Sequence, residues 1–170
     1  MGLDINFAKT KRTEWERFQK NLATYESLPV EEQTEGNNPY DNLESEEIGY
    51  FRKVNFLMSF FDYTGNCEYK EIPKDRLEEL RLRCIEIGRM KPVRTEVSKY
   101  PSGGLLSTKI YSEADQERCD ELLPTQPGFF FGNTDYNEWY FDDVKEVLVW
   151  VDGVLNDLAD DEVILMYCWW

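Results

Sequence analysis

The sequence contains no histidine, and this absence limits the chemistry that its 170 residues can support. Without histidine no Ser-His or Cys-His pair can form, so the commonest arrangements of nucleophile and base are excluded. The four cysteines are at least 17 positions apart and include no C-x-x-C pair, which argues against a zinc site. We expect them to be reduced and mostly buried thiols of a cytoplasmic protein.

The sequence also lacks a glycine-rich phosphate-binding loop. Gly103-Gly104 stands without the other glycines and the Lys-Ser/Thr pair that such a loop needs. Four acids between residues 135 and 143 could gather around Mg²⁺, but acids at this spacing are more often helix caps and turn formers. We therefore expect no cofactor and no metal site, and a metal-dependent hydrolase ranks third among the functions considered.

Long apolar runs and basic residues are both scarce. No stretch reaches the length needed to span a membrane, and the first residues lack the basic region and apolar run of a signal peptide. With 34 acids against 19 bases the net charge is −15, which repels nucleic acid and acidic membranes. Residues 31–50 and 142–162 each carry −7. These segments are either solvated faces or an acidic surface that docks on a basic partner.

Length and periodicity predict a single α+β domain over residues 1–170, in which about five helices pack on one face of a small mixed sheet of short strands. Helices are expected at about 13–27, 45–61, 75–88, 112–122 and 144–158, and strands at 2–8, 67–72, 129–131 and 163–170. The first and last strands are expected to pair beside the third. Residues 30–45 and 89–111, which are polar or interrupted by proline and glycine, are predicted to be exposed loops.

On the predicted helix 45–61, three polar side chains project from an otherwise apolar rod. Arg52, Asn55 and Ser59 fall together beside the apolar arc when residues are placed at 100° intervals. A buried arginine needs a carboxylate partner or an anionic ligand. Asp135 or Glu138 could supply the carboxylate, and both alternatives stay open.

The most unusual stretch of the sequence is Leu123–Val144, LPTQPGFFFGNTDYNEWYFDDV, which has seven aromatic residues between two turn signals and a helix start. Its aromatic residues either fill the core or form a concave wall on which a planar ligand stacks. In the second case Phe130, Tyr136 and Trp139 supply rings, and Thr134 and Asp135 supply polar groups beside them. Asp142 and Asp143 are the candidate N-caps of the following helix.

Three motifs carry a resemblance to a known family. They are MGLD at Met1–Asp4, GYFRKVN at Gly49–Asn55 and LPTQPGFFFGNTDYNEWY at Leu123–Tyr140. Together they resemble a family of uncharacterised small proteins encoded by bacteriophages, prophages and gut bacteria. The resemblance implies the cytoplasm of a bacterial host, where small phage proteins often counter host defences, but it implies no settled activity.

These observations lead to two hypotheses from different classes. The first is a binding protein without catalytic turnover, whose pocket joins Arg52, Asn55 and Ser59 to the aromatic wall and holds a small planar anion such as a nucleotide-like defence signal. The second is an acidic protein that mimics DNA and occupies the basic surface of a host DNA-binding protein. Neither requires direct contact with nucleic acid or membrane, and self-association stays open.

Overall fold

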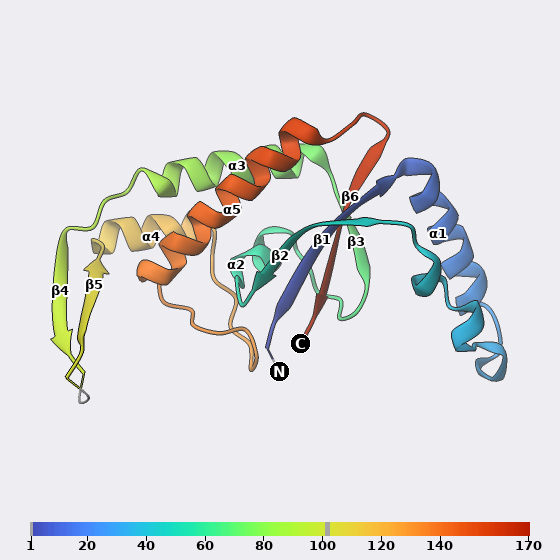
Figure 1. Ribbon diagram of the computed structural model, residues 1–170, viewed down its shortest axis with the longest axis horizontal. Coiled ribbons are helices and arrows are strands. Elements are labelled where there is room, and N and C mark those ends of the chain that lie inside the picture. The colour runs from blue at the N-terminus through green and yellow to red at the C-terminus, as the bar shows by residue number, and fades with distance from the viewer. Residues whose placement is uncertain (1, 101–102) are drawn as a thin grey trace.

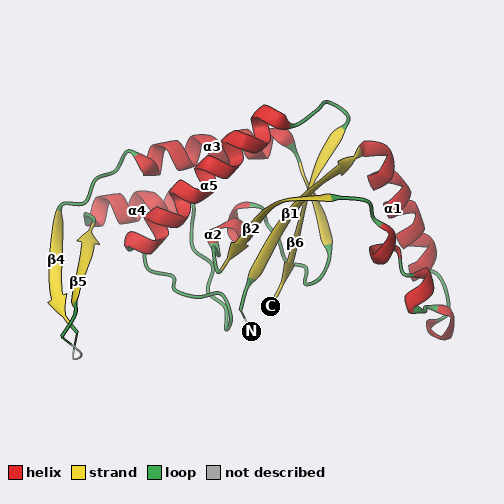
Figure 2. Cartoon of the chain, viewed as in Figure 1, coloured by secondary structure: helices red, strands yellow, loops and turns green. Residues whose placement is uncertain are grey.

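A computed structural model describes residues 2–100 and 103–170. Figures 1 and 2 show an elongated molecule in which a twisted sheet lies between helices. The strands are β1 (Asp4–Lys11), β2 (Glu46–Arg52), β3 (Tyr69–Ile72), β4 (Arg94–Lys99), β5 (Leu105–Ile110) and β6 (Glu162–Trp169). The α-helices are α1 (Arg12–Glu26), α2 (Phe56–Phe60), α3 (Lys74–Gly88), α4 (Glu113–Leu122) and α5 (Glu138–Asp157), and short 3-10 turns occupy Val30–Glu32, Glu35–Asn37 and Pro39–Asn42.

The main sheet has the order β2-β1-β6-β3, and every neighbouring pair in it is antiparallel. The predicted α+β class is therefore confirmed, and so is the pairing of the first and last strands, in which Asp4 lies opposite Trp169. The prediction of a mixed sheet was wrong. No pair of parallel strands occurs among the described residues, although helices lie in the long connections between the paired strands of the main sheet.

Helices cover both faces of the sheet, whereas one face was predicted. The central strand β6 shows why, because alternate side chains of a strand point to opposite faces. Val163 and Leu165 pack with Trp15 and Phe18 of α1 in one cluster. Ile164, Met166 and Cys168 join α3 and α5 in the larger cluster on the other face. A strand that is buried on both sides has a continuous apolar sequence without alternation, so its sequence does not show that helices cover both faces.

The predicted helix 45–61 is a strand followed by one short helix. Glu46–Arg52 forms β2 at the sheet edge, pairing with β1, and α2 begins only at Phe56. Lys53 separates the two elements with a φ of 63°, a left-handed conformation that ends a strand and cannot continue a helix. Gly49 also weakens a helix at this position. Edge pairing with β1 therefore overrode the helical spacing of the apolar residues.

Two further segments differ from prediction. Phe129–Phe131 is a turn and not a buried strand: the Phe131 amide donates to Gly128 O at 3.1 Å, and Phe129 is 95% exposed. Residues 89–111, predicted to be an irregular loop, contain the β4–β5 hairpin. No residue of β4 or β5 is buried, so the sequence shows no clear apolar alternation in these strands. No helix in the described part of the chain is both long and apolar enough to cross a bilayer.

Candidate functional site

A cavity of about 330 Å³ opens between the end of β2, the loop that precedes α5 and the first turns of α5. We call it the Arg52 cavity. Four of the predicted site residues line it, namely Arg52, Asn55, Asp135 and Trp139. Lys53, Asn137 and Asp143 also line it and were not among the predicted site residues. Residues from three separate parts of the chain therefore meet here, as the first hypothesis requires.

Asn55 holds the wall of the cavity together. Its Nδ2 donates to Phe131 O at 3.1 Å and to Asn133 O at 2.9 Å, and its Oδ1 accepts from the Gln126 amide at 3.2 Å. The side chain is buried, so these bonds satisfy an amide that water does not reach. Asn55 thus fixes the loop between α4 and α5, and its polar atoms are already engaged.

Arg52 is exposed at the end of β2, where a position in the core of a helix was predicted. Its nearest carboxylate belongs to Asp4, with Nε 4.0 Å from Oδ1. Neither predicted partner forms an ion pair with Arg52: Asp135 lines the same cavity but is not within 4.0 Å of the guanidinium, and Glu138 accepts a hydrogen bond from the Lys109 amide at 3.0 Å. The Arg52 side chain is 60% exposed and is consequently accessible to a ligand in the cavity.

Lys53 brings a second positive charge to the cavity. Within the described residues no acidic side chain lies within 4.0 Å of its ammonium group. Its stem packs on Gly132, where an added Cβ would lie 3.2 Å from Lys53 Cβ. Gly132 itself has a φ of 89°, a conformation that favours glycine. Lys53 and Gly132, both with left-handed backbones, therefore pack against each other, and both line the Arg52 cavity.

The first turn of α5 supplies the aromatic surface. Helix α5 begins at Glu138 and is capped by Asn137, whose Oδ1 accepts from the Trp139 amide at 3.0 Å and from the Tyr140 amide at 3.4 Å. The prediction of Asp142 or Asp143 as N-cap was therefore wrong. Trp139 is 57% exposed, so much of its indole ring is open to a stacking partner. The positive end of the helix dipole also lies at this wall.

Asp143 gives the cavity a group that titrates near neutral pH. Because the true cap lies six residues earlier, Asp143 sits within α5, where burial raises its pKa to about 6. The negative charges of Glu146 and Asp142 add to the rise. Asp143 is therefore largely neutral below pH 6 and charged above it.

The remaining predicted residues lie outside the Arg52 cavity. Ser59 is half-buried, with Oγ 3.5 Å from Gln126 Oε1, and Phe130 packs edge-on against Phe129. Thr134 and Tyr136 line a neighbouring hollow of about 300 Å³ beneath β5. The hydroxyl of Tyr136 accepts from the Thr125 amide at 3.2 Å and donates to Asp120, so it is already paired.

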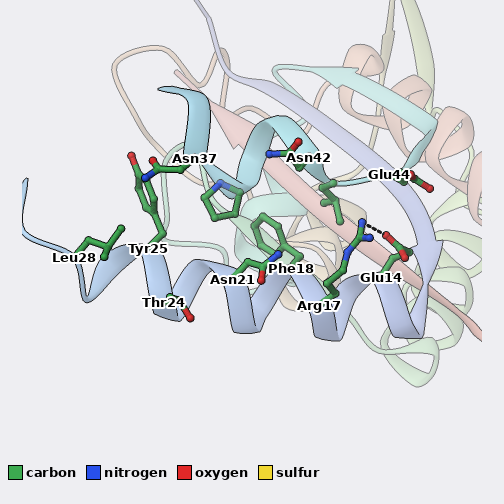
Figure 3. A pocket seen from close by; sticks show the side chains of 12 residues that line it. Glu14, Arg17, Phe18, Asn21, Thr24, Tyr25, Leu28, Asn37, Asn42 and Glu44 are labelled. Carbon is green, nitrogen blue, oxygen red and sulfur yellow. Dashed lines mark hydrogen bonds and ion pairs between the residues drawn. The ribbon is translucent and has the colours of Figure 1, made fainter. Parts of the chain in front are cut away.

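A larger cavity, of about 560 Å³, lies between α1 and the segment 37–44, and no predicted site residue lines it. Figure 3 shows Phe18 on α1 with Asn42 across the opening, and Arg17 bonded to Glu14 of the same helix. Asn37 is likewise committed, since Nδ2 donates to Glu32 O at 2.9 Å. Because Arg17 is paired with Glu14 and the Asn37 amide is already hydrogen-bonded, this cavity offers fewer free polar groups to a charged ligand than the Arg52 cavity does.

The described residues contain no group of three or more Asp, Glu or Cys side chains that could hold a metal ion. Comparisons with known protein families, with curated proteins and with solved structures found no match.

Proposed function

We propose that the chain is a binding protein without catalytic turnover, and that the Arg52 cavity holds a small planar anion of nucleotide type. One observation carries the proposal: Arg52, Lys53 and the open face of Trp139 line the same cavity. The guanidinium and the ammonium suit a phosphate group, and the indole suits a purine or pyrimidine ring. The cavity is within the size range of small-molecule sites.

One carboxylate in the wall fits the same class of ligand. Asp135, which is exposed, lines the cavity together with Trp139. A carboxylate accepts hydrogen bonds, and the bases of nucleotides carry exocyclic N–H donors. The resemblance to phage-encoded proteins supports a nucleotide-derived signal of a host defence system as the biological ligand. Sequestering such a signal needs binding alone.

Replacing Arg52 with alanine is expected to weaken nucleotide binding about ten- to a hundredfold, because one charge-assisted hydrogen bond contributes about 1.5 to 3 kcal/mol. Stability should hardly change, since the side chain is exposed and its single contact to Asp4 spans 4.0 Å. Calorimetric titration with a panel of mononucleotides and cyclic nucleotides measures the first effect, and a denaturant melt measures the second.

Arg17→Ala is the matched control. Arg17 is 53% exposed beside the larger cavity, where it pairs with Glu14, so its removal deletes the same charge outside the Arg52 cavity. If Arg52→Ala and Arg17→Ala lose the same nucleotide affinity, the loss reflects the net charge of the chain and not a contact made by Arg52. If no nucleotide in the panel binds the unaltered chain, the proposed function fails.

Affinity for an anion is expected to fall about fivefold as the pH rises through 6, because Asp143 becomes charged inside the cavity. A cyclic mononucleotide is the probe, since its phosphodiester does not titrate in this range. Asp143→Asn should remove the pH dependence and keep the tighter binding. Asp142→Asn, at an exposed carboxylate paired with Lys145, should leave the dependence in place. If affinity changes with pH to the same extent in Asp143→Asn and Asp142→Asn, this role of Asp143 is wrong.

The DNA-mimic hypothesis receives less support from the arrangement of charge. It requires the two acidic segments 31–50 and 142–162 to share one face. Tyr40 and Leu43 pack with the α1 cluster, whereas α5 belongs to the cluster on the opposite face of the sheet. Most acids of the first segment therefore lie across the sheet from those of α5.

A further inference from the structure

The β4–β5 hairpin has one face that is exposed along its whole length. Residues directly opposite each other in an antiparallel pair share a face, and Val97 lies opposite Ser107 while Lys99 lies opposite Leu105. The face is completed by Thr95 opposite Lys109, and all six side chains are exposed. On the other face, the β5 residues Leu106, Thr108 and Ile110 are half-buried. The hairpin thus leaves a defined surface uncovered.

This exposed face combines apolar and positive side chains. Val97 and Leu105 are 65% and 73% exposed, and Lys99 and Lys109 flank them. None of the six residues is acidic, and Glu96, the one acid of the hairpin, lies on the other face paired with Arg94. Five bases and one acid give residues 89–110 a charge of +4, so the rest of the chain carries −19.

An isolated two-stranded hairpin is marginally stable in water, so an uncovered one gains from a partner. Figure 1 shows the hairpin at the end of the molecule, beyond the α3–α4–α5 layer. Its anchor to α5 is the hydrogen bond from the Lys109 amide to Glu138 at 3.0 Å, in the first turn of that helix. The exposed face therefore projects from the body and is available for docking.

The complementary surface lies on the same chain, in a groove of about 340 Å³ between β2 and the C-terminal half of α5. Glu47 and Asp157 supply negative charge, and within the described residues neither forms an ion pair. Ile48 and Val149 supply apolar surface, and Val149 is 75% exposed. β2 is also an edge strand of the main sheet. The groove thus offers acidic and apolar groups together.

We propose that the exposed face of the hairpin docks in the β2–α5 groove of a second copy of the chain. Val97 and Leu105 would cover the apolar groups, and Lys99 and Lys109 would face Glu47 and Asp157. A second copy is favoured over nucleic acid, because a phosphate backbone offers no apolar partner for valine and leucine. Two such contacts related by a twofold axis would close a dimer.

The hairpin cannot reach the groove of its own chain. It is fixed at the first turn of α5, whereas the groove is lined by residues from Val149 to Leu158. At a rise of 1.5 Å per residue, about 15 to 30 Å of helix separate the two. The contact must therefore be made between copies.

Sedimentation velocity over a range of chain concentrations, at about 0.05 and 0.5 M salt, tests the proposal. We expect a monomer–dimer equilibrium that weakens at the higher salt. Ser107→Glu is expected to raise the dimer dissociation constant about tenfold, because it places a carboxylate on the docking face opposite acids. Ser98→Glu is the matched control: it adds the same charge to the same hairpin on its other face, and should change the constant less than about twofold.

A charge exchange identifies the groove. Lys99→Glu and Glu47→Lys should each weaken self-association, and an equimolar mixture of the two variants should recover it, because each copy then meets a complementary partner. A chain that stays monomeric at all concentrations overturns the proposal, as does equal weakening by Ser107→Glu and Ser98→Glu. Binding of a labelled single-stranded DNA by a monomeric chain, lost in Ser107→Glu, would replace the second copy with nucleic acid.

Discussion

Asn55→Leu is expected to lower the free energy of unfolding by about 3 kcal/mol. The leucine keeps the volume but deletes all three hydrogen bonds of the buried amide. Two carbonyl groups, those of Phe131 and Asn133, and the Gln126 amide then lose their partners. The loop that forms the outer wall of the Arg52 cavity should also loosen, so nucleotide binding should fall with stability.

Denaturant unfolding measures the change, with Ser59→Ala as its control. Ser59 contacts the same loop through Gln126, but at 3.5 Å, the limit of a hydrogen bond. Its removal should cost less than about 0.5 kcal/mol. If the two variants unfold at the same denaturant concentration, the anchoring role of Asn55 is wrong.

Gly49→Ala is expected to cost about 3 kcal/mol, although it adds a single methyl group. A Cβ at residue 49 would lie 2.4 Å from Nε1 of Trp150, closer than such atoms approach. The indole has no room to retreat, because it packs on Phe7 with ring centroids 4.3 Å apart and its Nε1 donates to Ile48 O at 2.8 Å. Either β2 or the Trp150 indole must therefore move, although β2 is hydrogen-bonded to β1 and the indole is fixed by the contacts just described.

A double-mutant cycle with Trp150→Ala separates this clash from a backbone effect. Trp150→Ala alone should cost about 3 to 5 kcal/mol. In that background Gly49→Ala should cost little, because the atom that it strikes has gone. Gly153→Ala is the control: nothing lies within 4 Å of its added Cβ in α5, so it should stabilise the chain by about 0.5 to 1 kcal/mol. An equal cost of Gly49→Ala in both backgrounds would contradict the clash.

Sequence reasoning succeeded where one periodicity dominated. The apolar spacing of Trp15 and Phe18 gave α1, and that of Leu77, Leu80 and Cys84 gave α3, each within a residue or two of its bounds. The class of the fold followed from those elements. The β2 segment defeated the same method, because a strand at the sheet edge is fixed by its partner β1 and not by its own pattern.

The candidate site was partly predictable for a related reason. Arg52 and Asn55 were grouped by a helical spacing that does not exist there, yet both line the cavity because the chain turns sharply at Lys53 between them. Ser59 was grouped by the same reasoning and lies elsewhere, since it belongs to α2 proper. Asp143 was interpreted as a cap, and only the true start of α5 reveals it as a wall residue.

The pairing of β1 with β6 also sets the order of events during synthesis. The two central strands of the sheet are residues 4–11 and 162–169, so the sheet cannot close until residues 162–169 have been made. Contacts between such distant segments require the largest loop to close, which slows folding. Until β6 arrives, both apolar faces that it will cover stay open to water. We infer that the nascent chain depends on chaperones more than its modest size suggests.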